Sequence, residues 1–401
     1  MKALVYNKNS ENKIELCERN IPQILDSKDA IVEVTLSSIC TSDLHIINGQ
    51  VPRANNNIIL GHEFVGKVIE IGADVKNIKI GNRVSANCET FCGECYFCKQ
   101  GYINNCENGG WELGCRIDGC QAEYVRVPYA DMGLTQIPDN VTDKNALFVG
   151  DILSSGYFGA EMCEIKPGDT IAVIGSGPVG MCSMICARLM GAEKIIAIDI
   201  NQNRLNIAKQ QNLADFYLNP NNSDIEDEVK KLTNNRGADG VIEAAGCSPH
   251  GVICYQQQHS FQQQFSSAGG VNIATDSPNA YTDTSISPFG GIRRQQPQSQ
   301  RQQGTFELAW KIARPNAIIG IVAMYEENQV LPLPQMYGKN LTFKTGGVDA
   351  IHCKKLLQLI SEGKINTDFL VTQTYPLKDI LDAYSYFKNN KDTCLKVAIT
   401  K

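Results

Sequence analysis

Four cysteines lie at short, regular spacing in one polar stretch of the chain. Cys92, Cys95, Cys98 and Cys106 follow the pattern C-x2-C-x2-C-x7-C. Four thiolates can complete the tetrahedral shell of a zinc ion, which leaves no open position for a substrate. The spacing therefore predicts a structural zinc site. Free or disulfide-linked thiols are the alternative, and Cys88, just upstream, leaves the choice of ligands open.

A glycine-rich loop stands between an apolar run and a stretch of helical pattern. It reads Gly-Ser-Gly-Pro-Val-Gly over 175–180 and follows the run 170–174. A GxGxxG sequence is informative in this strand-to-helix setting, because its glycines permit a tight turn, the approach of a pyrophosphate and close packing of the helix. The residues predicted to contact a dinucleotide here are Gly175, Gly177, Pro178, Val179 and Gly180.

An acidic residue follows this loop at the distance that a dinucleotide site requires. Asp199 comes nineteen positions after Gly180, at the end of the next apolar run. A carboxylate there can accept both hydroxyls of an adenosine ribose and would repel a 2′-phosphate, which favours NAD over NADP. Arg204 lies nearby and weakens that discrimination. A turn-forming glycine cluster with a surface aspartate is the alternative without a cofactor.

A second group of potential metal ligands is scattered along the chain. Cys40 begins the run Cys-Thr-Ser-Asp-Leu-His, His62 and Glu63 lie in Gly-His-Glu-Phe-Val-Gly, and Asp151 follows a glycine. A single Cys, His or Asp is more often structural or solvated than bound to metal. From these residues alone, the structural interpretation is the simpler one.

A longer pattern around His62 changes that interpretation. The run Gly61-His62-Glu63-x2-Gly66-x5-Gly72-x2-Val75 resembles the signature of zinc-containing alcohol dehydrogenases of the medium-chain dehydrogenase/reductase family. With the four cysteines and the glycine loop, the resemblance covers nearly the whole chain apart from residues 251–304. It implies a zinc-dependent oxidoreductase that transfers hydride between a small alcohol, or a hydrated aldehyde, and NAD.

The resemblance also implies a catalytic zinc site. It makes Cys40, His62 and Asp151 the ligands, with Glu63 as an occasional fourth ligand that exchanges with water or substrate. Many family members have Cys or Glu in place of Asp151. An Asp here is more similar to the branch of bacterial secondary-alcohol dehydrogenases and glutathione-independent formaldehyde dehydrogenases, and the four-cysteine motif favours the latter.

A path for the proton of the alcohol is implied as well. Ser42 and His45 match the family's relay, in which the serine hydroxyl passes the proton through the cofactor ribose to the imidazole. An imidazole suits this step because its unperturbed pKa lies near neutrality. Asp43 is expected to orient His62 from behind the metal. A solvated imidazole without a catalytic role is the alternative interpretation of His45.

Two regions of different pattern must position these residues. Up to about residue 150, short alternating strands such as 30–34 and 123–127 are separated by Gly, Pro and Asn turns, which indicates a β-rich region. From about residue 166, strands alternate with helical stretches, and we predict strands at 170–174, 194–199, 240–244 and 317–322. That alternation predicts a parallel, doubly wound sheet.

The resemblance implies how these regions divide into domains. It predicts an α/β protein whose GroES-like catalytic domain, a partly open β-barrel, consists of residues 1–155 and 349–401. Residues 156–348 would form a Rossmann domain that binds NAD at the carboxyl ends of its strands. The active site is then expected in the cleft between the domains. Dimers or tetramers are usual in the family, so we expect a homo-oligomer.

A low-complexity segment interrupts the Rossmann pattern at about residues 251–304. It contains glutamine runs and a Gln/Arg-rich end, and its removal in thought restores a short strand-to-helix turn. We therefore predict a disordered insertion. Because it follows a strand at the edge of the sheet where a dinucleotide binds, it would either obstruct the cleft or project from it.

Composition restricts the possible partners. The chain has 401 residues, of which 43% are apolar, enough for two domains with their own cores. A net charge of -6 without a dense basic block argues against nucleic acid and anionic membranes, and favours a small-molecule substrate. We expect neither a signal peptide nor a membrane helix, and hence a cytoplasmic protein whose sixteen cysteines are reduced.

Three alternatives stay open at this point. The first is a polyol or amino-alcohol dehydrogenase of the same fold, for which Glu would be the more usual third zinc ligand. The second is a zinc-ribbon module for nucleic acid, which the acidic balance and the complete dinucleotide motif oppose. The third is a non-catalytic zinc protein whose cofactor cleft is disabled by the insertion. The sequence identifies neither the substrate nor the direction of the reaction.

Overall fold

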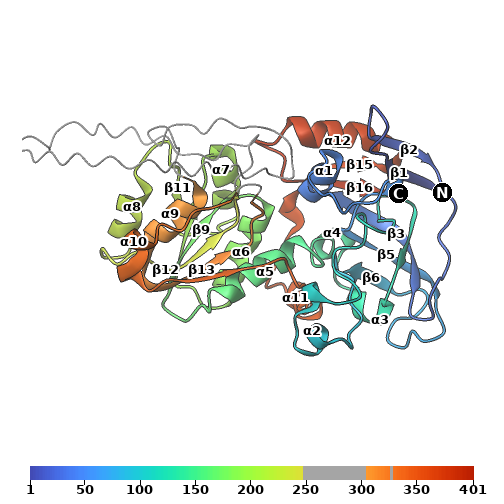
Figure 1. Ribbon diagram of the computed structural model, residues 1–401, viewed down its shortest axis with the longest axis horizontal. Helices are drawn as coiled ribbons and strands as arrows, with labels where there is room; N and C mark the ends of the chain where they lie inside the picture. Colours follow the sequence, from blue (N-terminus) through green and yellow to red (C-terminus); the bar gives the residue numbers. More distant parts are fainter. Residues whose placement is uncertain (247–303, 326–327) are drawn as a thin grey trace, which may run out of the picture.

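Two bodies of different secondary structure lie side by side along the long axis of the molecule (Figure 1). This computed structural model describes residues 1–246, 304–325 and 328–401. The body on the left of Figure 1 contains a sheet between helices, and the body on the right contains both chain termini. The insertion predicted at 251–304 lies outside the described residues, apart from Gly304.

A six-stranded parallel sheet forms the left-hand body. Its strand order is β11-β10-β9-β12-β13-β14, and all neighbours are parallel. The four predicted strands are confirmed as β9 (Thr170–Ile174), β10 (Lys194–Ile198), β12 (Ala238–Glu243) and β13 (Ala313–Ile321). The edge strands are β11 (Phe216–Leu218) and β14 (Thr342–Thr345). The predicted doubly wound sheet is therefore confirmed, and its strand order reverses between β9 and β12.

Helices cover this sheet and explain why its central strand β9 is buried along its whole length. They are α5 (Ile152–Met162), α6 (Pro178–Leu189), α7 (Gln202–Gln210), α8 (Ile225–Leu232) and α9 (Thr305–Ile312). All five residues of β9 are buried, as expected for a strand covered on both faces. Helices α5 and α6 pack closely, because a Cβ on Gly156 would lie only 2.5 Å from the Cβ of Cys182. The domain boundary predicted at 155/156 falls within α5.

Mostly antiparallel strands form the right-hand body. A seven-stranded sheet has the order β15-β16-β3-β5-β6-β8, with β7 also paired to β3, and a three-stranded sheet has the order β2-β1-β4. The strands are β1 (Lys2–Tyr6), β2 (Ile14–Glu18), β3 (Ala30–Ile39), β4 (Ile58–Ile59), β5 (Phe64–Ile71), β6 (Arg83–Ala86), β7 (Tyr124–Val127), β8 (Leu134–Gln136), β15 (Val371–Pro376) and β16 (Lys396–Thr400). Because β16 pairs with β3, the end of the chain completes the sheet begun near its start.

Further helices lie outside the set that covers the parallel sheet, and α10 among them belongs to the left-hand body. They are α1 (Thr41–Ile47), α2 (Tyr96–Lys99), α3 (Ala130–Gly133), α4 (Asp143–Ala146), α10 (Leu333–Met336), α11 (Cys353–Ser361) and α12 (Ile380–Asn389), with 3-10 turns at Ile103–Asn105, Tyr337–Lys339, Asp368–Leu370 and Leu377–Asp379. Within the described ranges, none of the helices has the length and apolar character needed to span a bilayer.

Candidate active site, zinc centres and cofactor loop

Three buried side chains from separate parts of the chain meet at one point. Cys40 directly follows β3 and is the N-cap of α1, His62 lies between β4 and β5, and Asp151 is the N-cap of α5. Their ligand atoms all lie within 4.8 Å of one another. The residues that the resemblance proposed as catalytic zinc ligands are thus brought together.

The chemistry of this group suits a cation. Its members are a thiol, an imidazole and a carboxylate, the donor types of catalytic zinc sites with three protein ligands and one open position. His62 Nε2 is 3.2 Å from Asp151 Oδ2. Burial lowers the pKa of His62, but hydrogen bonds with Asp151, Asp43 and Cys40 outweigh that effect and raise it well above its usual value. The site therefore favours added positive charge, as a metal-binding site would.

Asp43 holds two of the three candidate ligands. Its Oδ1 lies 3.5 Å from His62 Nδ1, the nitrogen that points away from Asp151. Its Oδ2 accepts a hydrogen bond of 2.9 Å from the backbone N–H of Cys40. This position agrees with the expected role of Asp43 in orienting His62.

Glu63 lies next to the site but has partners of its own. Its Oε2 is bound by the ammonium of Lys396 and the hydroxyl of Ser38. Burial raises the pKa of Glu63, although Lys396 opposes the rise. Lys396 is itself buried on β16 and also donates to the carbonyl of Ile39 at 3.1 Å. Occasional binding of Glu63 to zinc, as the resemblance implies, stays a prediction.

Lys396 and Ser38 were not among the residues expected at the site. The sequence does contain a signal for Lys396, because it lies within the otherwise apolar run Leu-Lys-Val-Ala-Ile at 395–399. A lysine in a buried strand requires a charged partner, since an isolated buried charge is costly. The partner itself could not be found without the structure, because Glu63 is distant in sequence.

The two residues of the expected proton relay lie on α1. Ser42 Oγ is 3.6 Å from Cys40 Sγ, which places the hydroxyl beside a candidate zinc ligand. His45 is half-buried, and its Nδ1 lies 2.7 Å from Gln50 Oε1. The path between them through a cofactor ribose stays a prediction.

The four-cysteine motif forms a second group of potential metal ligands. The sulfur atoms of Cys92, Cys95, Cys98 and Cys106 lie within 4.8 Å of one another. Backbone N–H groups donate to the sulfurs of Cys92 and Cys106 at 3.4 and 3.3 Å. Burial raises the pKa of Cys92, but hydrogen bonds from the backbone of Glu94 and from other groups lower it to about 6. The surroundings of Cys92 thus favour its thiolate, the form that binds zinc, whereas burial raises the pKa of Cys106 and raises that of Cys98 to about 12.

Cys88 does not belong to that group. It is buried, its backbone N–H donates to Gly150 at 3.0 Å, and burial raises the pKa of its thiol well above the usual value. Its sulfur is not among the four that lie within 4.8 Å of one another.

The glycine loop has the geometry that a dinucleotide site requires. It joins β9 to α6, with Gly175 at φ +98°, Gly177 as the helix N-cap and Pro178 in the first turn. A Cβ on Gly180 would lie only 1.8 Å from the carbonyl oxygen of Gly175. Only glycine therefore allows this strand and helix to approach so closely, while the helix N-terminus stays available to a phosphate.

Asp199 and Arg204 flank the loop as expected. Asp199 follows β10, and its Oδ2 accepts a hydrogen bond of 2.6 Å from the backbone N–H of Ser176. Arg204 Nη1 would be 3.7 Å from a Cβ on Gly177, and its Nη2 donates to the carbonyl of Lys391 at 2.8 Å. A carboxylate and a guanidinium thus both lie next to the loop, where the carboxylate can face a ribose and the cation a phosphate.

Polar and aromatic side chains near His62 were not expected from the sequence. The Trp111 ring meets His62 edge to face with 5.6 Å between ring centroids, and the Arg53 guanidinium lies 5.4 Å from the Trp111 ring. Glu89 precedes Thr90, which pairs with Gly110 through two backbone hydrogen bonds, and a Cβ on Gly110 would lie 3.7 Å from Glu89 Oε2. Burial, and secondarily the charge of Asp151, raise the pKa of Glu89 to about 8.

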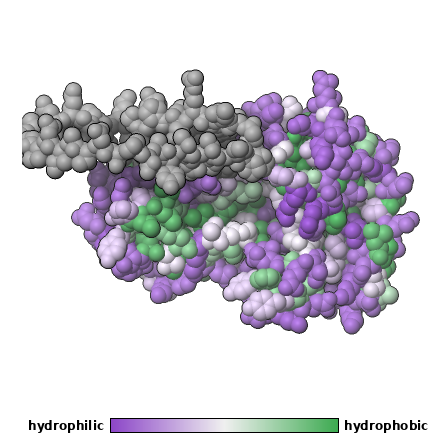
Figure 2. All heavy atoms as spheres, viewed as in Figure 1, coloured by the Kyte–Doolittle hydropathy of each residue, from purple (hydrophilic) through white to green (hydrophobic). Residues whose placement is uncertain are grey.

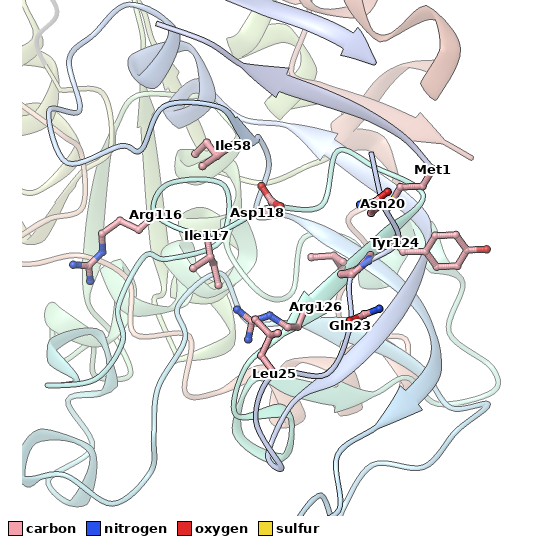
Figure 3. A pocket seen from close by; sticks show the side chains of 12 residues that line it. Met1, Asn20, Gln23, Leu25, Ile58, Arg116, Ile117, Asp118, Tyr124 and Arg126 are labelled. Atoms are coloured by element: carbon pink, nitrogen blue, oxygen red, sulfur yellow. The ribbon is translucent and has the colours of Figure 1, made fainter. Parts of the chain in front are cut away.

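A hollow of about 380 Å³ lies elsewhere on the β-rich body (Figure 3). Its lining includes Gln23, Asp118, Tyr124 and Arg126, and none of the predicted metal or cofactor residues. It is therefore separate from the candidate active site.

Comparisons with known proteins agree with this architecture. The family model of the alcohol dehydrogenase GroES-like domain matches residues 26–139, and that of the zinc-binding dehydrogenases matches residues 178–258. An alcohol dehydrogenase of Cupriavidus necator is 33% identical, and the alignment covers 100% of this chain and 98% of that one. An NADP-dependent isopropanol dehydrogenase of Clostridium beijerinckii is 38% identical over 240 residues, which cover 59% of this chain and 68% of that one.

Solved structures give the same result. The alcohol dehydrogenase TADH from Thermus sp. ATN1 superposes with a TM-score of 0.80 at 29% identity, covering 100% of this chain and 99% of that one. Fold and site together define a two-domain dehydrogenase with a GroES-like and a Rossmann part. The chain belongs to the zinc-type, medium-chain alcohol dehydrogenase family. Membership supports alcohol oxidoreductase activity and implies zinc, a nicotinamide cofactor and a small alcohol or aldehyde as substrate.

Proposed function

We propose that the protein transfers hydride between a small alcohol, or a hydrated aldehyde, and NAD at a zinc ion held by Cys40, His62 and Asp151. The convergence of these three buried donors within 4.8 Å supports the proposal most directly. Zinc bound there supplies a Lewis acid that lowers the pKa of the substrate hydroxyl. The branch of secondary-alcohol and glutathione-independent formaldehyde dehydrogenases is part of the same proposal, because Asp151 is the third donor.

The surrounding residues prepare the site for this chemistry. Asp43 fixes the ring of His62 and the backbone of Cys40. Lys396 balances the charge of Glu63, so that the buried carboxylates do not face one another without a cation. Ser42, next to Cys40, accepts the proton of the alcohol, and His45 delivers it to solvent.

NAD is the proposed cofactor, with NADP disfavoured. NAD would supply the hydride acceptor, and the loop from Gly175 to Gly180 and Arg204 would hold its phosphates. Asp199 already accepts backbone N–H groups from Ser176 and Asn201, at 2.6 and 2.7 Å. A carboxylate in this position can accept ribose hydroxyls through its remaining lone pairs but repels a phosphate.

The remaining parts of the proposal concern the whole protein. Cys92, Cys95, Cys98 and Cys106 bind a second zinc ion with a structural role. The protein acts in the cytoplasm on a small molecule and not on nucleic acid or membranes, as the acidic charge balance favours. It forms a homo-oligomer, either a dimer or a tetramer. Exposed apolar residues of the Rossmann body support an oligomer, among them Val330, Leu331, Leu333 and Tyr337.

One observation favours a second candidate substrate class, the diols and amino alcohols. The carboxylate of Glu89 is half-buried near Gly110, and no residue that the structure describes donates a hydrogen bond to it. A substrate with a hydroxyl or ammonium group next to the reacting carbon would supply the missing donor. Glu89→Leu should then lower kcat/KM for 2,3-butanediol by about tenfold or more while that for 2-propanol is kept.

The proposal is tested with zinc-replete protein and a panel of alcohols. Methanol, ethanol, 2-propanol, 2,3-butanediol and hydrated formaldehyde are each mixed with NAD, with NADP in parallel, and reduced nicotinamide is followed by its absorbance. We expect turnover of at least one substrate, with NAD preferred. Absence of NAD binding, in a protein that holds two zinc ions, would instead favour a non-catalytic zinc protein.

A further inference from the structure

A buried chain of hydrogen bonds leads from the C-terminal helix α12 to Asp43, whose carboxylate lies next to the candidate zinc ligand His62. The Tyr384 hydroxyl donates to Gln121 Oε1 at 2.7 Å, and Gln121 Nε2 donates to Asp43 Oδ2 at 3.1 Å. Asp43 Oδ1 in turn lies 3.5 Å from His62 Nδ1. Gln121 and Asp43 are fully buried and Tyr384 is 4% exposed, so water cannot replace these contacts.

These hydrogen bonds define the position of the Asp43 carboxylate. Oδ2 receives one hydrogen bond from Gln121 and one from the backbone N–H of Cys40, which fixes the carboxylate plane and leaves Oδ1 for His62. A glutamine amide can adopt two orientations that differ by exchange of its oxygen and nitrogen. The Tyr384 hydroxyl donates to the oxygen and so favours the orientation that presents Nε2 to Asp43.

We propose that Tyr384 and Gln121 are positioning residues for the catalytic zinc: through Asp43 they hold the His62 ring at the angle that zinc binding requires. This inference rests on the proposed function, because it assigns these residues to the same site. Tyr384 reaches the site from α12, whose apolar side packs in the core around Leu4, Ile39 and Leu60. Docking of the C-terminal segment thereby contributes to the geometry of a site whose ligands come from the first half of the chain.

A purely structural role for Tyr384 predicts different behaviour. In that case its hydroxyl matters only as a buried polar group, and its removal changes the free energy of unfolding without changing the metal site. A positioning role predicts faster loss of zinc and an altered ligand field at a metal in the site, because ligand orientation is affected.

The test compares Tyr384→Phe with Tyr386→Phe in full-length holoprotein. Both variants remove one hydroxyl from α12, but Tyr386 is only half-buried, packs against Tyr375 and lies outside the chain to His62. Zinc loss to a chelator is followed at the catalytic site, and the visible spectrum is recorded after replacement of that zinc by Co²⁺. We expect Tyr384→Phe to lose zinc about 3- to 10-fold faster and to shift the cobalt spectrum, and Tyr386→Phe to match the wild type.

A second variant keeps the inference testable if Tyr384→Phe folds poorly. Gln121→Leu breaks the same chain one step nearer to Asp43, and the double variant should lose zinc no faster than Gln121→Leu alone, because both changes remove one pathway. If single variants that fold keep the wild-type zinc-loss rate and cobalt spectrum while the wild type holds two zinc ions, the inference is wrong and the proposed function stands. A wild type that binds a single zinc ion, at the four cysteines, contradicts both.

Discussion

Charge compensation decides the role of individual residues at this site. Lys396, Glu63 and Asp151 are buried together with Cys40, and an uncompensated buried charge costs several kcal/mol. The ammonium of Lys396 and a bound metal cation would together compensate the negative charges of these buried groups. This interdependence explains why a lysine is tolerated in the otherwise apolar strand β16.

Removal of Lys396 should reveal that interdependence. Lys396→Met leaves the Glu63 carboxylate buried without its ammonium partner, and we expect the free energy of unfolding to fall by about 3–5 kcal/mol. Urea unfolding of the zinc-replete protein measures the change. Combining Lys396→Met with Glu63→Gln should restore part of the lost free energy of unfolding. As a control, Lys364→Met breaks only an exposed ion pair with Glu362 and should have little effect.

At the residue scale, the sequence predicted those site residues that carry a motif. Cys40, His62 and Asp151 could be proposed as one group because the chain resembles a family signature around His62, and the structure brings their ligand atoms within 4.8 Å of one another. Lys396, Gln121 and Tyr384 could not, because each of them contacts a partner brought close only by the pairing of β16 with β3 and the packing of α12. Neither spacing nor periodicity encodes such contacts.

Elements of secondary structure were predicted where both faces of a strand are buried. The runs at 170–174 and 194–199 were identified almost to the residue, because a continuous apolar run between turns is typical of a parallel sheet. The edge strands β11 and β14 were missed, since they are short and only half-buried. Helix α5 also shows why the domain limits of 1–155, 156–348 and 349–401 stay a prediction: one continuous helix crosses the first of them.

The contact between β9 and α6 provides a test at the level of elements. Gly180→Ala places a Cβ within 1.8 Å of the Gly175 carbonyl, so the helix must move away from the strand. We expect NAD binding to weaken by at least about tenfold and the free energy of unfolding to fall by about 1–3 kcal/mol. Calorimetric titration and urea unfolding measure these effects. Gly338→Ala is the matched control, because no atom lies within 4 Å of its Cβ position.

At the scale of the whole molecule, the Rossmann body exposes apolar side chains on one face (Figure 2). Among the exposed apolar residues of this body are Leu331, Leu333 and Tyr337, which is 89% exposed, and they precede the edge strand β14 in sequence. Exposed apolar groups beside an edge strand are typical of contacts between subunits. We predict that Leu333→Asp combined with Tyr337→Asp lowers the molecular mass measured by light scattering to that of one chain. Leu25→Asp, on the exposed surface of the other body, should leave the mass unchanged; an unchanged mass in the double variant would place the interface elsewhere.

The contact between the residues that flank the low-complexity insertion predicts the effect of deleting it. Thr305 Oγ1 lies 3.4 Å from the carbonyl oxygen of Gly246, so β12 and α9 meet directly. A chain without residues 251–303 should therefore fold and bind NAD at least as tightly as the full chain, because the remaining link is short and the entropy of loop closure is smaller. Circular dichroism and NAD titration measure both properties. Loss of folding would show that the segment is an integral part of the domain.

The central claim is that Cys40, His62 and Asp151 hold the zinc ion at which the alcohol reacts. The most direct measurement determines zinc content and NAD-linked turnover in the same sample, for the wild type and for Asp151→Ala. We predict two zinc ions per chain and turnover in the wild type, and one zinc ion with turnover lowered more than about 100-fold in the variant. An Asp151→Ala protein that keeps both its second zinc ion and its turnover would contradict the claim.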